Sequence, residues 1–324
     1  MSRARHVLVI GGGANAEHDV SLASAAAVRG ALLRSRHLVT GLTIGPDGEW
    51  ETLSGSRIGL AAAIQRMRES DVIFPALHGE GTEDGTLAGL LEVVGVPYVG
   101  SGVRAGALGM DKWASKLIAE HLGIRTARGV LVDGDTVRGD PASLALPVIV
   151  KPVASGSSYG AARVEQREAL AAAVSRAKQF DSRVLIEEFI VGREIDVAVM
   201  RTADGEILIA PPLEIGKGAD EVFDTALKYD AQPNFLLPAQ LPADTEEALR
   251  LAARAIYEAL GCAGVARVDF FVRGDEIVFN EINTMPGMTE HSQVPRMFAE
   301  GGVPFAELAA RLVAAADARR TRTS

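Results

Sequence analysis

The stretch GVARVDFFVRGDEIVFNEINTMPGMTEHS (264–292) contains two predicted strands, 266–272 and 276–283, around Arg273, Gly274 and Asp275. Side chains alternate between the two faces of a strand. With a three-residue turn, the residue numbers of two paired residues add to an even sum. All odd-numbered residues of the two strands then lie on one face, and all even-numbered residues lie on the other. Four polar side chains then lie on one face: Arg267, Asp269, Glu281 and Asn283. A two-residue turn would break this arrangement.

This polar face predicts a site for a metal ion and a nucleotide. Two carboxylates and an amide oxygen are hard ligands that suit Mg²⁺, an ion that also binds nucleotide phosphates. The alternative is the solvated outer face of a hairpin. We favour a functional site because Arg267 stands among the acids and TMPGMTEHS (284–292) follows at once.

A second segment, KPVASGSSYG (151–160), predicts a phosphate-binding turn. Lys151 ends a strand and supplies a point charge, and the N–H and hydroxyl groups of the following small residues can surround phosphate oxygens. It is not a Walker A loop, because G-x-x-x-x-G-K-[ST] does not occur in the chain. A flexible hairpin is the structural alternative.

The segment VLIEEFIVGREID (184–196) combines an apolar strand with Glu187, Glu188 and Glu194. Adenosine needs acceptors for its amino group and ribose hydroxyls together with apolar walls, and this segment offers both. Exposed acids at a strand end explain the pattern equally well. The loop-like stretch 216–238 follows, and connections longer than about 12–15 residues are usually functional or disordered.

Strands and helices alternate over the first hundred residues, which predicts an α/β domain with a doubly wound parallel sheet. The expected strands are 6–10, 37–44, 71–77 and 96–100, and the expected helices are 17–34, 57–69 and 86–94. Loops after the carboxyl ends of such strands tend to bind ligands. Here these loops read GGGANAEHD, HGEGTEDG and GSG.

The first of these loops contains GGGANA (11–16), which matches the weak dinucleotide fingerprint G-x-G-x-x-A. A nicotinamide enzyme needs an acid for the ribose about 20 residues later, and 31–45 contains none. A glycine turn before a helix still forms an anion site, although Glu17 would attract an ammonium group. A tight turn with helix-start acids is the alternative.

Composition limits the classes of function. The chain has 324 residues, enough for about two domains, and 48% hydrophobic with 23% charged residues indicates a folded protein. A net charge of −9 gives no overall attraction for phosphate backbones, so we expect no nucleic-acid partner, and RRTRTS (319–324) is interpreted as a solvated tail. Cys262 is the one cysteine, so no intrachain disulfide forms. Without a stretch of roughly 18 apolar residues we expect no membrane partner and a cytoplasmic protein.

Taken together, nine segments resemble the D-alanine–D-alanine ligase family of the ATP-grasp superfamily over nearly the whole chain. They are GGGANAEHDVS (11–21), LHGEGTEDGT (77–86), PYVGSG (97–102), MDK (110–112), LPVIVKPVASGSSYG (146–160), IEEFIVGREI (186–195), LKYD (227–230), GVARVDF (264–270) and NEINTMPGMTEHS (280–292).

The resemblance implies an ATP-grasp fold, with the later parts mixed α+β. It divides the chain into an N-terminal Rossmann-like substrate domain (1–108), a central subdomain (109–192), a C-terminal subdomain with the metal and oxyanion site (193–318) and a tail (319–324). The implied partners are ATP and D-alanine, two Mg²⁺ ions with Mn²⁺ as the alternative ion, and a second copy in a homodimer.

The resemblance also implies roles for individual residues. ATP would contact Lys112, Lys151, Ser157, Ser158, Glu187, Phe189, Ile190, Glu194 and Lys228. The metals would bind Asp269, Glu281 and Asn283. The catalytic set would be Glu17, Ser157, Tyr229, Arg267 and Gly287, of which all but Ser157 also bind substrate, together with His78 and Ser292.

The implied reaction joins two D-alanines through an acyl phosphate, which requires exclusion of water, and 216–238 is the candidate lid. The first loop departs from the family by Asn15 in place of a frequent serine, and Met285 and Gln293 occupy variable positions. Three alternatives remain. They are an ATP-grasp ligase for other amino acids, a dehydrogenase, and a non-catalytic nucleotide sensor.

Overall fold

The alternating N-terminal pattern forms a four-stranded sheet in the order β3-β2-β1-β4. The computed structural model describes residues 4–216 and 234–320. The elements are β1 (His6–Gly12), α1 (His18–Arg34), β2 (Leu38–Ile44), β3 (Trp50–Thr52), α2 (Gly59–Arg68), β4 (Val72–Pro75) and α3 (Thr86–Val94). β1 pairs in parallel with β2 and β4, as predicted.

Two details of this sheet differ from the prediction. The short strand β3 was missed, and it pairs antiparallel with β2 at the sheet edge. The expected strand 96–100 is reduced to a single bridge between Ile73 and Tyr98. Both pieces are too short for a hydrophobic period to identify.

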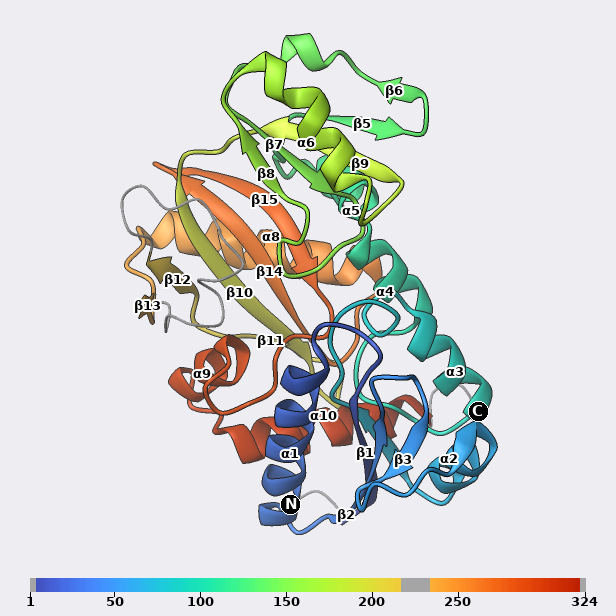
Figure 1. Cartoon of the computed structure of the whole chain (residues 1–324). Helices are drawn as coiled ribbons and strands as arrows, with labels where there is room; N and C mark the ends of the chain where they lie inside the picture. The colour runs from blue at the N-terminus through green and yellow to red at the C-terminus, as the bar shows by residue number, and fades with distance from the viewer. Residues whose placement is uncertain (1–3, 217–233, 321–324) are drawn as a thin grey trace.

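A second sheet, antiparallel throughout, has the order β6-β5-β9-β7-β8 and stands above the others in Figure 1. Two helices, α4 (Val103–Met110) and α5 (Lys112–His121), lead into it. Its elements are β5 (Gly129–Asp133), β6 (Thr136–Arg138), η1 (Pro141–Ser143), β7 (Val148–Pro152), β8 (Ala162–Val164), η2 (Arg167–Ala169), α6 (Leu170–Ala177) and β9 (Arg183–Glu188). The expected boundary between residues 108 and 109 lies within helix α4.

The third sheet has the order β13-β12-β10-β14-β15, with β11 paired to β10. Its elements are β10 (Arg193–Arg201), β11 (Ile207–Ile209), β12 (Leu213–Gly216), β13 (Asn234–Leu236), α8 (Ala243–Leu260), β14 (Val265–Arg273) and β15 (Glu276–Asn283), followed by α9 (Gln293–Glu300) and α10 (Phe305–Arg320). Helix α8 covers one face of the sheet (Figure 1), with Tyr257 and Leu260 fully buried against Phe270 and Phe279. The other face is left for the site.

In the sequence, Leu249, Ala252, Ile256 and Leu260 recur at helical spacing, which predicts a helix over 245–260 with Asp244 as its cap and Gly261 at its end. Helix α8 begins and ends close to these residues. Pro242 occupies the N-cap in place of the expected Asp244, which lies in the first turn, where its charge favours the positive end of the helix. Gly261 ends the helix in a left-handed conformation, with φ 74°, as the sequence predicted.

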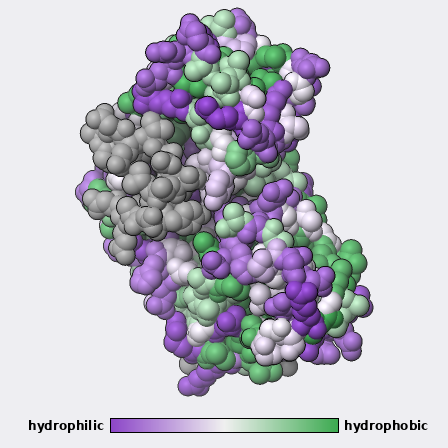
Figure 2. Space-filling model, viewed as in Figure 1, coloured by the Kyte–Doolittle hydropathy of each residue, from purple (hydrophilic) through white to green (hydrophobic). Residues whose placement is uncertain are grey.

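Hydrophilic residues cover much of the face shown in Figure 2, with smaller hydrophobic groups between them. Within the described residues, no helix combines the length and the apolar character needed to cross a membrane.

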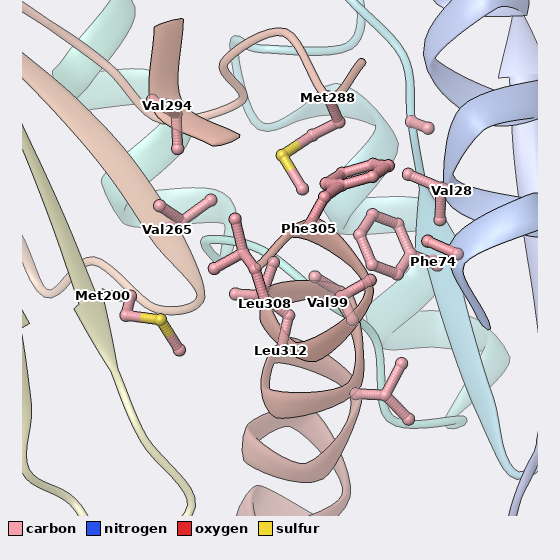
Figure 3. Packing of buried hydrophobic residues seen from close by; sticks show 14 of the residues in the cluster. Val28, Phe74, Val99, Met200, Val265, Met288, Val294, Phe305, Leu308 and Leu312 are labelled. Carbon is pink, nitrogen blue, oxygen red and sulfur yellow. The ribbon is translucent and has the colours of Figure 1, made fainter. Parts of the chain in front are cut away.

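Helix α10 joins the first and third sheets. Figure 3 shows Phe305, Leu308 and Leu312 of α10 packed between Phe74 of β4 and Val265 of β14. The helix continues into the predicted tail, since Arg319 lies within it and donates to the carbonyl oxygens of Gly100, at 3.0 Å, and Tyr98. Arg319 is therefore part of the fold and not of a solvated tail, whereas residues 321–324 lie outside the described residues.

Candidate active site

The hairpin β14–β15 places the four predicted polar residues on one face, by a different route from the one expected. Arg273 pairs with Glu276, so the turn has two residues and the predicted three-residue turn is wrong. A β-bulge restores the parity, because Phe270 pairs with Phe279 whereas Asp269 pairs with Glu281. Asn280 is the extra residue, and Arg267 then faces Asn283.

Arg267 is anchored by a bidentate ion pair. Its Nε and Nη2 each donate to one carboxylate oxygen of Asp269, both at 2.7 Å. Nη1 donates to Gln293 Oε1 at 2.9 Å, and Nε lies 3.4 Å from Asp196 Oδ2. Although burial opposes the charge, Asp269 and Asp196 raise the pKa of Arg267 well above its ordinary value. The guanidinium is a permanent cation with a fixed orientation.

The expected metal ligands share this face. Asp269 is 4% exposed, and the Glu281 carboxylate lies 3.3 Å from Lys112 Nζ. Asn283 Oδ1 accepts from the Met285 amide at 2.8 Å. Each oxygen has more than one acceptor direction, so these bonds leave ligation possible. The donor set therefore fits a hard cation such as Mg²⁺.

Two carboxylates and an amide form a small ligand set for one ion. Among residues 4–216 and 234–320, no group of three or more His, Cys, Asp or Glu side chains is arranged to bind a metal. Mg²⁺ commonly takes only one or two protein carboxylates, with phosphates and water completing its shell. The set of Asp269, Glu281 and Asn283 matches that habit.

Lys112 connects the face to the loop after β7. Asp111 caps helix α5 by accepting from the Ala114 amide at 2.8 Å, which fixes the start of the helix. From there Lys112 Nζ donates to the Ser155 carbonyl oxygen at 2.7 Å and pairs with Glu281. The first lysine of the predicted ATP set therefore lies between the glycine-rich loop and a predicted metal ligand.

The second lysine of the set belongs to a buried cluster. Lys151 Nζ lies 2.5 Å from Glu187 Oε1 and donates to Asn280 Oδ1 at 3.3 Å. Lys116 Nζ lies 2.7 Å from Glu187 Oε2. The two groups form an ion pair, although their orientation does not suit a hydrogen bond. Burial opposes the Glu187 charge, yet Lys116 and Lys151 lower the pKa of Glu187 below its ordinary value. Glu187 is thus an ionised counter-ion between two lysines.

Glu17 and Ser157 meet across 140 residues of sequence. Ser157 Oγ donates to Glu17 Oε1 at 2.5 Å, which joins the loop after β7 to the start of α1. Ser157 and Ser158 both have left-handed backbones, with φ 47° and 58°. Such conformations are unfavourable for residues other than glycine and often mark functional loops. Glu17 is the N-cap residue of α1, but its side chain makes no capping bond to the helix.

Asn15 holds the two N-terminal loops together. Its Nδ2 donates to the carbonyl oxygens of His78 and Glu80, both at 2.9 Å, while its Oδ1 accepts from the Glu17 amide at 2.9 Å. The preceding Gly12 has φ 86°, and a Cβ there would lie 2.1 Å from the Ile44 carbonyl oxygen. The glycine turn therefore serves backbone packing, and Asn15 orients the start of α1.

His78 is not on the open face of the site. It is 3% exposed, and its Nδ1 lies 3.0 Å from the Met285 carbonyl oxygen. Its Nε2 lies 2.9 Å from Ser24 Oγ, so Nδ1 is the protonated nitrogen and Ser24 donates to Nε2. Burial lowers the pKa of His78. The neutral ring thus ties the first sheet to the loop after β15.

Gly287 and Ser292 lie together in that loop. A Cβ on Gly287 would come 3.0 Å from Ser292 Oγ. Ser292 Oγ accepts from the Thr289 amide at 3.1 Å and lies 2.8 Å from Thr289 Oγ1. These contacts fix the turn before α9, which begins at Gln293.

The predicted adenosine residues lie where β9 leads into β10. Ile190 is buried with Val278 and is packed by Phe271, both of the polar hairpin. The Arg163 guanidinium stacks on the Phe189 ring at 4.5 Å, so a cation covers this ring. Glu194 is 7% exposed and faces Phe271 across the β10–β14 pair.

Four residues of this region escaped the sequence reasoning: Lys116, Asp196, Gln293 and Glu83. Burial raises the pKa of Glu83 to about 8, and the negative charge of Glu17 adds to the shift. The Gly79 amide, which donates to Glu83 Oε1 at 3.1 Å, opposes it. The expected contacts of Lys228 and Tyr229, and most of the candidate lid, fall outside the described residues.

The sequence is similar to known ligases over almost its full length. Residues 118–314 match the family described as D-ala D-ala ligase C-terminus, and residues 54–101 match D-ala D-ala ligase N-terminus. The chain is 37% identical to D-alanine–D-alanine ligase A of Mesorhizobium japonicum, over 98% of this chain and 99% of that protein. It is 40% identical to the D-alanine–D-alanine ligase of Rhodococcus jostii, again over 98% and 99%.

Solved structures give the same picture. The VanG D-Ala:D-Ser ligase from Enterococcus faecalis superposes with a TM-score of 0.84 at 30% identity, covering 97% of this chain and 100% of that one. The D-alanine–D-alanine ligase from Bacillus anthracis complexed with ATP gives 0.83 at 26% identity, covering 99% and 100%. The three-sheet arrangement is therefore the ATP-grasp architecture of these ligases.

Proposed function

Since the chain belongs to the D-alanine–D-alanine ligase family, we propose that it joins two D-alanines into D-alanyl-D-alanine, with ATP converted to ADP and phosphate. The dipeptide is a precursor of peptidoglycan. The observation that supports this most directly is the shared face of Arg267, Asp269, Glu281 and Asn283 beside Lys112. On this face Arg267 would stabilise an oxyanion, and the three oxygen ligands would hold a metal ion with its nucleotide. Lys112, which would contact a phosphate, lies next to them.

The first step would activate a carboxylate. A carboxylate reacts poorly with amines because oxide is a poor leaving group. One oxygen of the first D-alanine attacks the γ-phosphorus of ATP, the bond to ADP breaks, and an acyl phosphate forms. Lys112 and Lys151 would offset phosphate charge, and Ser158 and the backbone of its loop would cover the phosphates. The adenosine would lie against Ile190, Phe189, Glu187 and Glu194.

The donor set of Asp269, Glu281 and Asn283 would hold Mg²⁺. When bound there, the ion would supply charge neutralisation for the β- and γ-phosphates. Mn²⁺ satisfies the same oxygen ligands.

The second step would form the peptide bond. The amine of the second D-alanine attacks the acyl carbon, a proton leaves the amine, and phosphate departs. Arg267 and the Gly287 amide would stabilise the oxyanion, while Glu17 would hold the ammonium group of the first D-alanine. Ser292 would meet the carboxylate of the second. We assign His78 to holding the Met285 segment, because its ring is buried and bonded on both nitrogens.

The family resemblance supplies the remaining parts of the proposal. Tyr229 would complete the hydrogen-bonded group of Glu17 and Ser157, and Lys228 would reach a phosphate. A homodimer in the cytoplasm is the expected form, with domains at 1–108, 109–192 and 193–318.

The test is phosphate release with ATP, Mg²⁺ and D-alanine, followed by identification of the dipeptide. Arg267→Ala should lower kcat about 100- to 1,000-fold, as for loss of an oxyanion-hole donor. Arg254→Ala, at an arginine 54% exposed on α8, is the matched control. Equal turnover with L-alanine, or no dipeptide with D-alanine, would remove the proposed substrate.

A second substrate is favoured by one specific observation, the likeness to a D-Ala:D-Ser ligase. Competition between D-alanine and D-serine as second substrate separates the two assignments. Preferential formation of D-alanyl-D-serine would identify the chain as a ligase of that other specificity.

A further inference from the structure

Two buried carboxylates face each other across the β10–β14 pair. Asp196 of β10 is directly opposite Asp269 of β14, and they are 0% and 4% exposed. Like charges at facing positions of a sheet repel each other. Arg267 lies within reach of both, because its Nε is 2.7 Å from Asp269 Oδ1 and 3.4 Å from Asp196 Oδ2.

Gln293 completes the contact between Arg267 and Asp196. Its Oε1 accepts from Arg267 Nη1 at 2.9 Å, and its Nε2 donates to Asp196 Oδ2 at 2.8 Å. A neutral amide can accept from a guanidinium with its oxygen and donate to a carboxylate with its nitrogen. Leucine or methionine can do neither, and glutamate would face Asp196 with a second negative charge.

The bridge also joins two parts of the site. Gln293 is the first residue of α9 and follows Ser292, whereas Arg267 belongs to the sheet. Among the described residues, Asp269 and Gln293 accept three of the five guanidinium N–H groups of Arg267. Within the same residues the two other N–H groups, one on Nη1 and one on Nη2, donate to no protein acceptor, and under the proposed function they would face the substrate.

We propose that Gln293 and Asp196 are positioning residues for Arg267. The Asp269 fork fixes one edge of the guanidinium, and the Gln293–Asp196 bridge fixes Nη1 and ties it to the start of α9. Arg267 and the Ser292 turn are then held as one unit. This rests on the proposed function, in which Arg267 receives the oxyanion and Ser292 the second carboxylate.

Substitutions of Gln293 test the bridge without touching the ATP lysines. Gln293→Met keeps the length of the side chain and removes both bonds, so kcat should fall about 10- to 100-fold, as expected for a misplaced catalytic group. KM for ATP should change less than about twofold, because the bonds lost are not to the nucleotide residues. Gln65→Met, at an exposed glutamine of α2, is the control and should retain wild-type kinetics.

A charge exchange separates positioning from general stability. Gln293→Glu alone places a carboxylate against Asp196 and should be the least active variant. Adding Asp196→Asn gives the double variant the same net charge as the wild type. The new amide at 196 can then donate to the new carboxylate at 293, so the bridge has a donor and an acceptor again. Recovery to within about threefold of wild type is expected, because contacting residues are energetically coupled.

A second measurement does not depend on activity. The guanidinium ¹⁵N–¹H signals of Arg267, assigned with Arg267→Lys, should show slowed Nη exchange in the wild type and faster exchange in Gln293→Met. If the wild type makes no dipeptide, the ligase proposal fails and this readout still tests the bridge. Unchanged kcat or exchange in a folded Gln293→Met, or no recovery in the double variant, would overturn the positioning role.

Discussion

Replacing Lys116 by methionine tests whether Glu187 is held as a counter-ion between two lysines. Lys116 is 4% exposed, and its Nζ lies 2.7 Å from Glu187 Oε2. Lys151 Nζ lies 2.5 Å from the other carboxylate oxygen, Oε1, and this partner is retained in the variant. Removing one partner of a buried pair costs about 3–5 kcal/mol when the remaining charge is uncompensated. Because Lys151 still neutralises Glu187, we expect about 2–3 kcal/mol.

The expected loss is measurable by thermal unfolding. An unfolding entropy of about 2.1 cal/mol/K per residue gives roughly 0.7 kcal/mol/K for 324 residues, so Tm should fall by about 3–4 °C. Lys178→Met, at an exposed lysine after α6, should leave Tm within about 1 °C, as is usual for surface substitutions.

The same substitution in a Glu187→Gln background gives the sharper result. There Lys116 is a buried ammonium group without a carboxylate beside it, and burial lowers its pKa. Removing it should be neutral or stabilising, because the desolvation penalty disappears with the charge. An equal loss of stability in both backgrounds would show that Lys116 contributes through packing, and the counter-ion argument would be refuted.

Three further outcomes follow from burial and register. Deleting Asn280 removes the extra residue of the bulge and leaves the strand pairs in register, so this variant should fold. Deleting Phe279 instead places Asn280 opposite Phe270 in the core. This variant should lose about 3–5 kcal/mol of unfolding free energy, measured by urea unfolding. The lowered pKa of His78 means that the unfolded chain binds a proton more readily. The contribution of neutral His78 to the free energy of unfolding should therefore be complete above pH 6.5 and decline below it. Urea unfolding midpoints measured between pH 8 and pH 5.5 should fall less for His78→Asn than for the wild type. Burial raises the pKa of Cys262 to about 12, so iodoacetamide at pH 8 should leave the native thiol unmodified by mass spectrometry and label it after unfolding; labelling of the native chain would contradict this.

Long periodic elements were predictable from the sequence, and short edge elements were not. The β1, β2 and β4 strands and the helices α1, α3 and α8 have an apolar period that identifies type and approximate ends. The edge strand β3 has three residues, too few for a period. Helix α4 contains Gly106 and Gly109, and glycine weakens the helix signal.

The site residues fall into two groups for the same reason. Glycine-rich loops, a lysine at a strand end and acids on one strand face are local patterns, and all of them pointed to this region before the structure. Lys116, Asp196 and Gln293 are recognisable only by their partners, which lie 71, 71 and 26 residues away in sequence (116 to 187, 196 to 267, and 267 to 293). No local signal marks such a pair.

The bulge shows where sequence reasoning could have gone further. With a two-residue turn and a regular ladder, Ile282 would lie on the polar face and Glu281 would enter the core. Ile277 and Phe279 are odd-numbered apolar residues of the core face, whereas Ile282 is even-numbered. The apolar parity therefore changes once between 279 and 282, and one unpaired residue must absorb the change. Burial of these side chains selects the bulged ladder, since the regular one would desolvate a carboxylate and expose an isoleucine. The core of the hairpin thus decides which residues reach the site.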